Sequence, residues 1–164
     1  KEADTINPDY LIVDTPGQIE LFAYRQSGPF FVNEFVADEK MNIFLFDGTM
    51  VSTPSNFVSL TLLSTSIRLR LGLPTVNVIT KTDLIQEKLE RVLSWSGTDS
   101  QLEADLAGEL NGDTFSLVSD MLSSLNRHDF QQDLIPVSNV TGDGMVNLQS
   151  ALSRTINLGE ELED

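Results

Sequence analysis

Four short apolar runs, separated by longer segments, constrain the fold of this chain most strongly. Each run is rich in β-branched or aromatic residues and lacks a clean polar alternation, which is typical of strands buried on both faces of a parallel sheet. The predicted strands lie at residues 10–13, 42–46, 75–79 and 134–137.

The segments between these runs carry helix signals. Ser27-Gly28-Pro29 and Ser52-Thr53-Pro54 place a hydroxyl residue and a proline where helices commonly begin. Gly72 and Pro74 end the second of these helices. The predicted helices cover residues 27–36, 52–71, 84–95, 101–110, 115–125 and 145–158.

This alternation of strands and helices predicts an α/β fold, a doubly wound and mainly parallel sheet. We expect residues 1–164 to form a single domain with a small helical insertion at about residues 84–130. Ligands bind to such sheets at the carboxyl ends of the strands. The polar residues that follow the apolar runs are therefore the candidate functional residues.

The first predicted strand runs directly into the sequence DTPGQIE, residues 14–20. An acid such as Asp14 can hold a magnesium ion here, directly or through water, as the equivalent aspartate does in P-loop NTPases. Gly17 lets a terminal phosphate approach its N–H group, Gln18 can orient an attacking water, and Glu20 can bind that water or act as a base. The alternative is an Asx-type turn before a helix whose first turn favours acids.

The third predicted strand ends in Thr80-Lys81-Thr82-Asp83. This has the form of the base-reading motif of GTPases, usually Asn-Lys-x-Asp. A carboxylate at Asp83 can accept hydrogen bonds from the N1–H and amino groups of guanine, a donor pair that adenine lacks. The aliphatic stem of Lys81 can pack along the purine. Alternatively, Thr82 or Asp83 is the N-cap of the following helix.

Two further strand ends carry polar residues. Ser138 and Asn139 follow the last strand, where GTPases commonly have Ser-Ala and the backbone N–H after the serine meets guanine O6. The Asn139 backbone keeps this donor, although Ser, Asn, Thr and Gly are also ordinary loop residues. Asp47 ends the second strand, and we expect it to cap a turn rather than to face a phosphate.

Composition excludes several kinds of site. The chain has no cysteine and one histidine, His128, which excludes thiolate chemistry and leaves little room for a Ser-His triad or a multi-histidine metal site. Any metal should have oxygen ligands, as magnesium and calcium do. The formal net charge of −15 argues against direct nucleic-acid or membrane-surface binding. With no apolar stretch near the length of a membrane span and no signal peptide, we expect a cytoplasmic protein.

The string DTPGQIE is similar to the switch segment of the GPN-loop GTPases. The stretch FLFDGTMVSTPSNFVS at residues 44–59, the following Leu-Gly-Leu-Pro run and the threonine at Thr80 resemble the same family. The resemblance covers nearly the whole chain and is greater to the archaeal form. It implies a P-loop fold, a homodimer, magnesium, and hydrolysis of GTP, with Gln18 and Glu20 around the catalytic water. Eukaryotic members are associated with RNA polymerase assembly and nuclear import, which implies an RNA polymerase-related protein partner.

The sequence also departs from that family, because it contains neither a G-x-x-x-x-G-K-[ST] motif nor a Gly-Pro-Asn tripeptide. We therefore expect an N-terminally truncated, partial GTPase domain that lacks the P-loop strand. That loss should leave a gap between the strands at residues 10–13 and 42–46, or let them pair directly.

Without a P-loop, most of the phosphate-binding energy is absent, so the chain alone should hydrolyse no GTP at a useful rate. The alternative interpretation is a nucleotide-independent binding or assembly module. A start at Lys1 without methionine, together with the retained Gln18 and Glu20, favours a GTPase.

Overall fold

The computed structural model describes residues 9–15, 17–96, 101–127 and 134–160. The chain divides into two compact units, Lys1–Val36 and Ala37–Asp164, and each is considered by itself. The glutamate at position 20 is described through its backbone only, and His128 lies outside the described residues.

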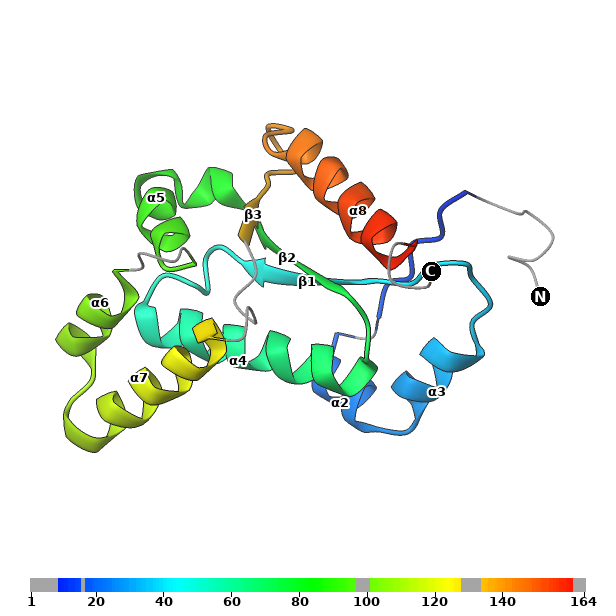
Figure 1. Ribbon diagram of the computed structural model, residues 1–164. Helices are drawn as coiled ribbons and strands as arrows, with labels where there is room; N and C mark the ends of the chain where they lie inside the picture. The colour runs from blue at the N-terminus through cyan, green and yellow to red at the C-terminus, as the bar shows by residue number, and fades with distance from the viewer. Residues whose placement is uncertain (1–8, 16, 97–100, 128–133, 161–164) are drawn as a thin grey trace. The chain divides into compact units, whose positions relative to one another are not determined.

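The second unit is built on a parallel sheet with the strand order β1-β2-β3 (Figure 1). Three of the predicted strands are confirmed, as β1 (Asn42–Asp47), β2 (Thr75–Thr80) and β3 (Leu134–Pro136). The register pairs Asp47 with Thr80 and Ile79 with Pro136. Strand β2 is central and its first five residues are buried, the polar Thr75 and Asn77 among them, as expected for a strand that is covered on both faces.

Helices cover both faces of this sheet, as expected for a doubly wound fold. Figure 1 shows α4 (Pro54–Leu71) and α8 (Met145–Glu160) on opposite sides of the strands. On the α4 side the rings of Phe46 and Phe57 stack 6.3 Å apart. On the α8 side Ala151 joins Val76 and Val78 in a buried cluster. Alternate residues of the strands thus supply the two layers of the core.

The signals read from the sequence set the ends of α4. The Thr53 hydroxyl accepts a hydrogen bond from the Asn56 N–H, and Pro54 is the first helical residue. At the other end Gly72 adopts a left-handed conformation with φ of 67°, and its N–H binds the Arg68 carbonyl. A residue with a side chain would be strained there, so glycine stops this helix cleanly.

The segment after β2 is helical, as predicted. A short 3₁₀ turn, η1 (Thr82–Leu84), precedes α5 (Gln86–Ser94), α6 (Leu102–Glu109) and α7 (Gly112–Arg127). Trp95 is buried at the end of α5, where its ring lies 5.6 Å from that of Phe57 on α4. Among the described residues, no helix combines the length and hydropathy that crossing a membrane requires.

The first unit contains α2 (Ile19–Tyr24) and α3 (Ser27–Glu34), joined by a short turn. The rings of Phe22 and Phe31 meet edge to face, with centroids 6.4 Å apart. Gly28 permits this turn, because a Cβ there would lie 2.2 Å from the Phe22 carbonyl oxygen. The two helices therefore pack through a small aromatic contact.

The predicted strand at residues 10–13 is wrong. These residues form no strand, and their side chains are exposed, from 47% for Leu11 and Val13 to 89% for Ile12. Direct pairing with β1 is therefore not formed either, since the sheet of the described residues contains β1, β2 and β3 only. An apolar run becomes a strand only where a neighbour satisfies its backbone N–H and C=O groups, and the described residues supply none.

Candidate functional site

The carboxyl ends of the three parallel strands meet at one edge of the sheet. Asp47 ends β1, Lys81 and Asp83 follow β2, and Ser138 follows β3. Backbone hydrogen bonds continue past the strands, from the Gly48 N–H to the Thr80 carbonyl at 3.0 Å and from the Thr82 N–H to the Val137 carbonyl at 3.3 Å. The loops that carry the candidate residues are therefore tied to one another.

The predicted base-reading residues come together at this edge. The Ser138 hydroxyl donates a hydrogen bond of 2.6 Å to Oδ1 of Asp83, 55 positions earlier in the chain. Ser138 is 1% exposed, whereas Asp83 is only partly buried. Within the described residues Asp83 accepts no other hydrogen bond, which leaves carboxylate lone pairs for a ligand.

The alternative that Thr82 or Asp83 caps the next helix is wrong. Lys81 precedes the 3₁₀ turn and Ile85 precedes α5, and no side chain caps either element. The Asp83 carboxylate is directed to Ser138 instead. A capping role therefore does not explain why an acid occupies this position.

Ser138 also shapes the loop after β3. Its oxygen accepts hydrogen bonds of 3.2 Å from the Val140 and Thr141 N–H groups, and its carbonyl accepts one of 2.9 Å from Gly142. Asn139 is exposed, and its N–H has no hydrogen-bond acceptor among the described residues. Asn139, which directly follows the serine bound to Asp83, thus has a backbone donor that no other described residue uses.

Lys81 has an unusual backbone. Among the described residues, Lys81 alone combines a side chain with a positive φ, which is 58°. This left-handed conformation raises the free energy of the backbone by about 1–3 kcal/mol. Its ammonium donates a hydrogen bond of 2.6 Å to Oδ2 of Asp47. Their side chains are 55% and 28% exposed, and an ion pair so accessible to solvent contributes at most about 1 kcal/mol. The ion pair therefore does not offset the backbone strain.

Asp47 is held from two sides. Its Oδ1 accepts hydrogen bonds from the N–H and the hydroxyl of Thr49, at 2.9 and 2.6 Å, which confirms the predicted turn. The hydrogen bond from Lys81, followed by that from the Thr49 hydroxyl, holds the pKa of Asp47 below its usual range. The sequence placed Asp47 and Lys81 at the ends of two strands, but it did not predict the contact between their side chains.

The other predicted site residues lie close together in sequence, within residues 14–20 of the first unit. Asp14, Gly17 and Gln18 are exposed, and α2 begins directly after Gln18. The glutamate at position 20 lies in the first turn of α2, so the helix of the alternative interpretation is present, whereas its turn includes position 16, which lies outside the described residues. A Cβ at Gly17 would meet nothing within 4 Å among the described residues, and its φ is not left-handed. The described part of the protein itself therefore does not require a glycine there.

The described residues contain no ready-made metal site with three or more acidic or histidine ligands. Asp14 contributes a single exposed carboxylate. This donor set fits a magnesium ion that takes its other ligands from substrate phosphates and water, and it does not fit an all-protein calcium cage.

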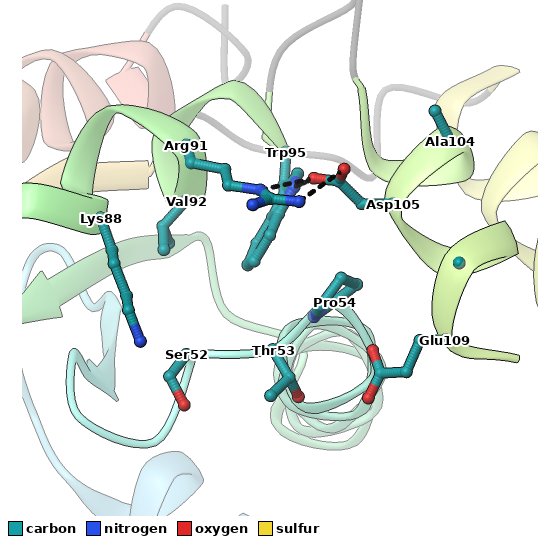
Figure 2. A pocket seen from close by; sticks show the side chains of 11 residues that line it. Ser52, Thr53, Pro54, Lys88, Arg91, Val92, Trp95, Ala104, Asp105 and Glu109 are labelled. Atoms are coloured by element: carbon teal, nitrogen blue, oxygen red, sulfur yellow. Dashed lines mark hydrogen bonds and ion pairs between the residues drawn. The ribbon is translucent and has the colours of Figure 1, made fainter.

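A separate cavity of about 580 Å³ lies between the start of α4, α5 and α6 (Figure 2). It is lined by none of the predicted site residues. Its acids bind groups of the neighbouring helices, since Asp105 accepts hydrogen bonds from Arg91 and Trp95 and Glu109 accepts one from the Ser55 N–H. The cavity is best explained as a junction between helices.

Residues 1–158 match the model of a family described as "Conserved hypothetical ATP binding protein". GPN-loop GTPase 1 of Saccharomyces cerevisiae is 30% identical over 155 residues, and GPN-loop GTPase QQT2 of Arabidopsis thaliana is 31% identical over 148 residues. The chain belongs to the GPN-loop GTPase family. The alignments cover 88% of the chain in both cases, but only 40% and 37% of those two proteins.

A solved structure supports the same fold. The chain is similar to a GTPase from Pyrococcus abyssi in its apo form, with a TM-score of 0.76, 22% identity, and coverage of 90% of this chain and 58% of that one. The three-stranded parallel sheet with its helices therefore has the architecture of a P-loop GTPase. Like the alignments with the GPN-loop GTPases, this likeness covers only part of the longer protein.

Proposed function

We propose that the chain supplies the guanine-reading loops and the metal-and-water segment of a protein that binds GTP with Mg²⁺ and hydrolyses it to GDP and phosphate. The observation that carries the proposal is the hydrogen bond between Ser138 and Asp83, which joins the carboxylate to the loop whose next residue, Asn139, has an N–H group that no other described residue uses. Membership of a GTPase family supports it.

The identity of the bound base is the part of this proposal that an experiment can test most clearly. The matching family model is described as ATP-binding, whereas the relatives are named GTPases. A carboxylate that accepts hydrogen bonds pairs with the N1–H and amino donors of guanine, and a backbone N–H pairs with its O6. Adenine offers an acceptor at N1 and a donor at N6, so it meets both protein groups with the wrong polarity. Asp83 and Asn139 therefore favour GTP.

The hydrolytic step is assigned to the first unit. Asp14 would be the carboxylate linked to Mg²⁺, which supplies charge neutralisation to the phosphates when bound. Gly17 would offer its N–H to the terminal phosphate, Gln18 would orient the attacking water, and Glu20 would accept its proton or its hydrogen bond. Among the described residues nothing makes a glycine sterically necessary at position 17, which supports a role toward a ligand.

Phosphate binding needs groups beyond these residues, since the 164 residues contain no P-loop motif. The inactivity of the isolated chain therefore stays a prediction. A homodimer, an RNA polymerase-related partner and a cytoplasmic location also stay predictions, which rest on the family resemblance and, for the location, on the sequence composition.

The substitution Asp83→Asn in the full-length protein tests the base assignment. The oxygen of the asparagine amide still accepts a hydrogen bond from N1–H of guanine, but its NH₂ group then faces the 2-amino group, which is also a donor. Xanthine has a carbonyl at position 2, which can accept from the NH₂ group. Losing a hydrogen bond to a charged group should weaken GDP binding about tenfold or more, and affinity for xanthosine diphosphate should rise.

Titration of a fluorescent GDP analogue, with competition by each unlabelled diphosphate, measures both effects. Asp120→Asn, which removes an exposed carboxylate in α7, is the matched charge control and should change neither affinity. Unchanged GDP affinity in Asp83→Asn would exclude the proposed base contact.

A further inference from the structure

The contact between Lys81 and Asp47 has no evident structural purpose. Lys81 is held in a strained left-handed conformation, and the ion pair that it forms is accessible to solvent. Backbone strain of this kind persists where the surroundings impose it, and it concentrates at sites that bind ligands. The conformation therefore points to a role for the Lys81 side chain in binding.

Asp47 is built to hold that side chain in one place. Thr49 fixes one carboxylate oxygen through two hydrogen bonds, while the other oxygen binds the Lys81 ammonium. The backbones of both partners are fixed as well, because Asp47 pairs with Thr80 in the sheet and Lys81 follows Thr80 directly. The four-carbon stem of Lys81 is thus anchored at both ends.

The anchoring also decides what Lys81 can do. A lysine whose ammonium is paired with a carboxylate is a poor ligand for a phosphate, because the carboxylate repels the phosphate. Its aliphatic stem, which lies between the anchored ends, remains available for apolar contact. The stem starts two residues before Asp83, the residue that reads the base edge.

We propose that Asp47 is a positioning residue for nucleotide binding: it holds the Lys81 ammonium so that the lysine stem lies along the face of the bound guanine. This inference rests on the proposed function, because it requires a guanine nucleotide beside Asp83. Asp47 itself touches neither base nor phosphate and acts only through Lys81.

A double-mutant cycle in the full-length protein tests the proposal. The variants are Asp47→Asn, which keeps an acceptor for Thr49, Lys81→Met, which keeps the apolar stem without the ammonium, and the pair together. Freeing one long side chain should weaken GDP binding about three- to tenfold in each single variant. The double variant should be no weaker than the single variants, since each removes the same anchor.

Steady-state kinetics separate positioning from a general structural effect. The KM for GTP should rise in all three variants while kcat at saturating GTP stays unchanged, because the anchor acts on binding and not on the reacting atoms. Asp38→Asn, which removes an exposed carboxylate of the same unit, is the control and should leave KM unchanged. Thermal unfolding of each variant shows whether it is folded.

The outcomes distinguish this inference from the proposed function. If the unmodified protein binds no guanine nucleotide, the proposed function fails. If it binds GDP but Asp47→Asn binds equally well, or if the two single effects add in the double variant, the positioning role of Asp47 is refuted. A fall in kcat with unchanged KM would also refute it.

Discussion

At the scale of single residues, the loop after β3 depends on two glycines with different surroundings. Gly142 and Gly144 both have left-handed backbones, with φ of 80° and 78°. A Cβ at Gly142 would meet nothing within 4 Å, whereas a Cβ at Gly144 would lie 1.8 Å from the Pro136 carbonyl oxygen. Only Gly144 therefore allows the loop to close against the end of β3.

Alanine at each position separates backbone strain from this close approach. Gly142→Ala should lower the free energy of unfolding by about 1–2 kcal/mol, because only the left-handed backbone opposes it. Gly144→Ala should cost about 3 kcal/mol or more, since the clash adds to the same strain. Urea unfolding of the two variants measures the difference, and equal losses would contradict the steric account.

The sequence predicted which residues lie at the carboxyl ends of the strands better than it predicted the contacts between their side chains. The positions of Asp83 and Ser138 after consecutive parallel strands indicated that they share one edge, and the structure joins them. The contact between Asp47 and Lys81 could not be predicted, because a sequence pattern places strand ends but does not choose the rotamer of a lysine. The sequence does not predict the left-handed backbone of Lys81 either.

At the scale of elements, Asp105 links α5 to α6. Its carboxylate accepts hydrogen bonds from Arg91 at 3.0 and 2.9 Å and from the Trp95 indole at 2.7 Å (Figure 2). Arg91, followed by Trp95, holds the pKa of Asp105 below its usual range. Arg91 lies largely in solvent, so the link fixes the orientation of the two helices more than it stabilises the fold.

The lowered pKa of Asp105 predicts how stability changes with pH. A carboxyl with a lower pKa in the folded state stabilises the fold at neutral pH, and this contribution is lost as the pH falls below about 4. Asp105→Asn removes that titration, so its free energy of unfolding should fall less between pH 5 and pH 3 than that of the unmodified protein. Denaturant titrations across this range measure the difference, and parallel pH profiles would contradict the assignment.

The sequence predicted an element correctly where residues within or next to that element determine its ends. Thr53, Pro54 and Gly72 bound α4 as predicted, because helix caps depend on neighbouring residues alone. The run at residues 10–13 resembled a buried strand but is exposed and irregular. Strand formation depends on a partner that is distant in sequence, so local composition cannot decide it.

At the scale of the whole molecule, the chain divides into two compact units, and the proposed function gives each unit a different task. The second unit holds the residues that would read the base, and the first unit holds those that would act on the phosphates. The chain spans 40% and 37% of the two GPN-loop GTPases described above. In the proposed function, the residues that select the base, Lys81, Asp83 and Asn139, all lie within these 164 residues, whereas a P-loop motif does not.

Selection of guanine over adenine is the central claim, and calorimetric titration of the full-length protein with GTP and with ATP, each with Mg²⁺, tests it most directly. Because ATP would leave Asp83 and Asn139 facing groups of the wrong polarity, GTP should bind at least about a hundredfold more tightly. Equal affinity for the two nucleotides, or tighter binding of ATP, would contradict the account.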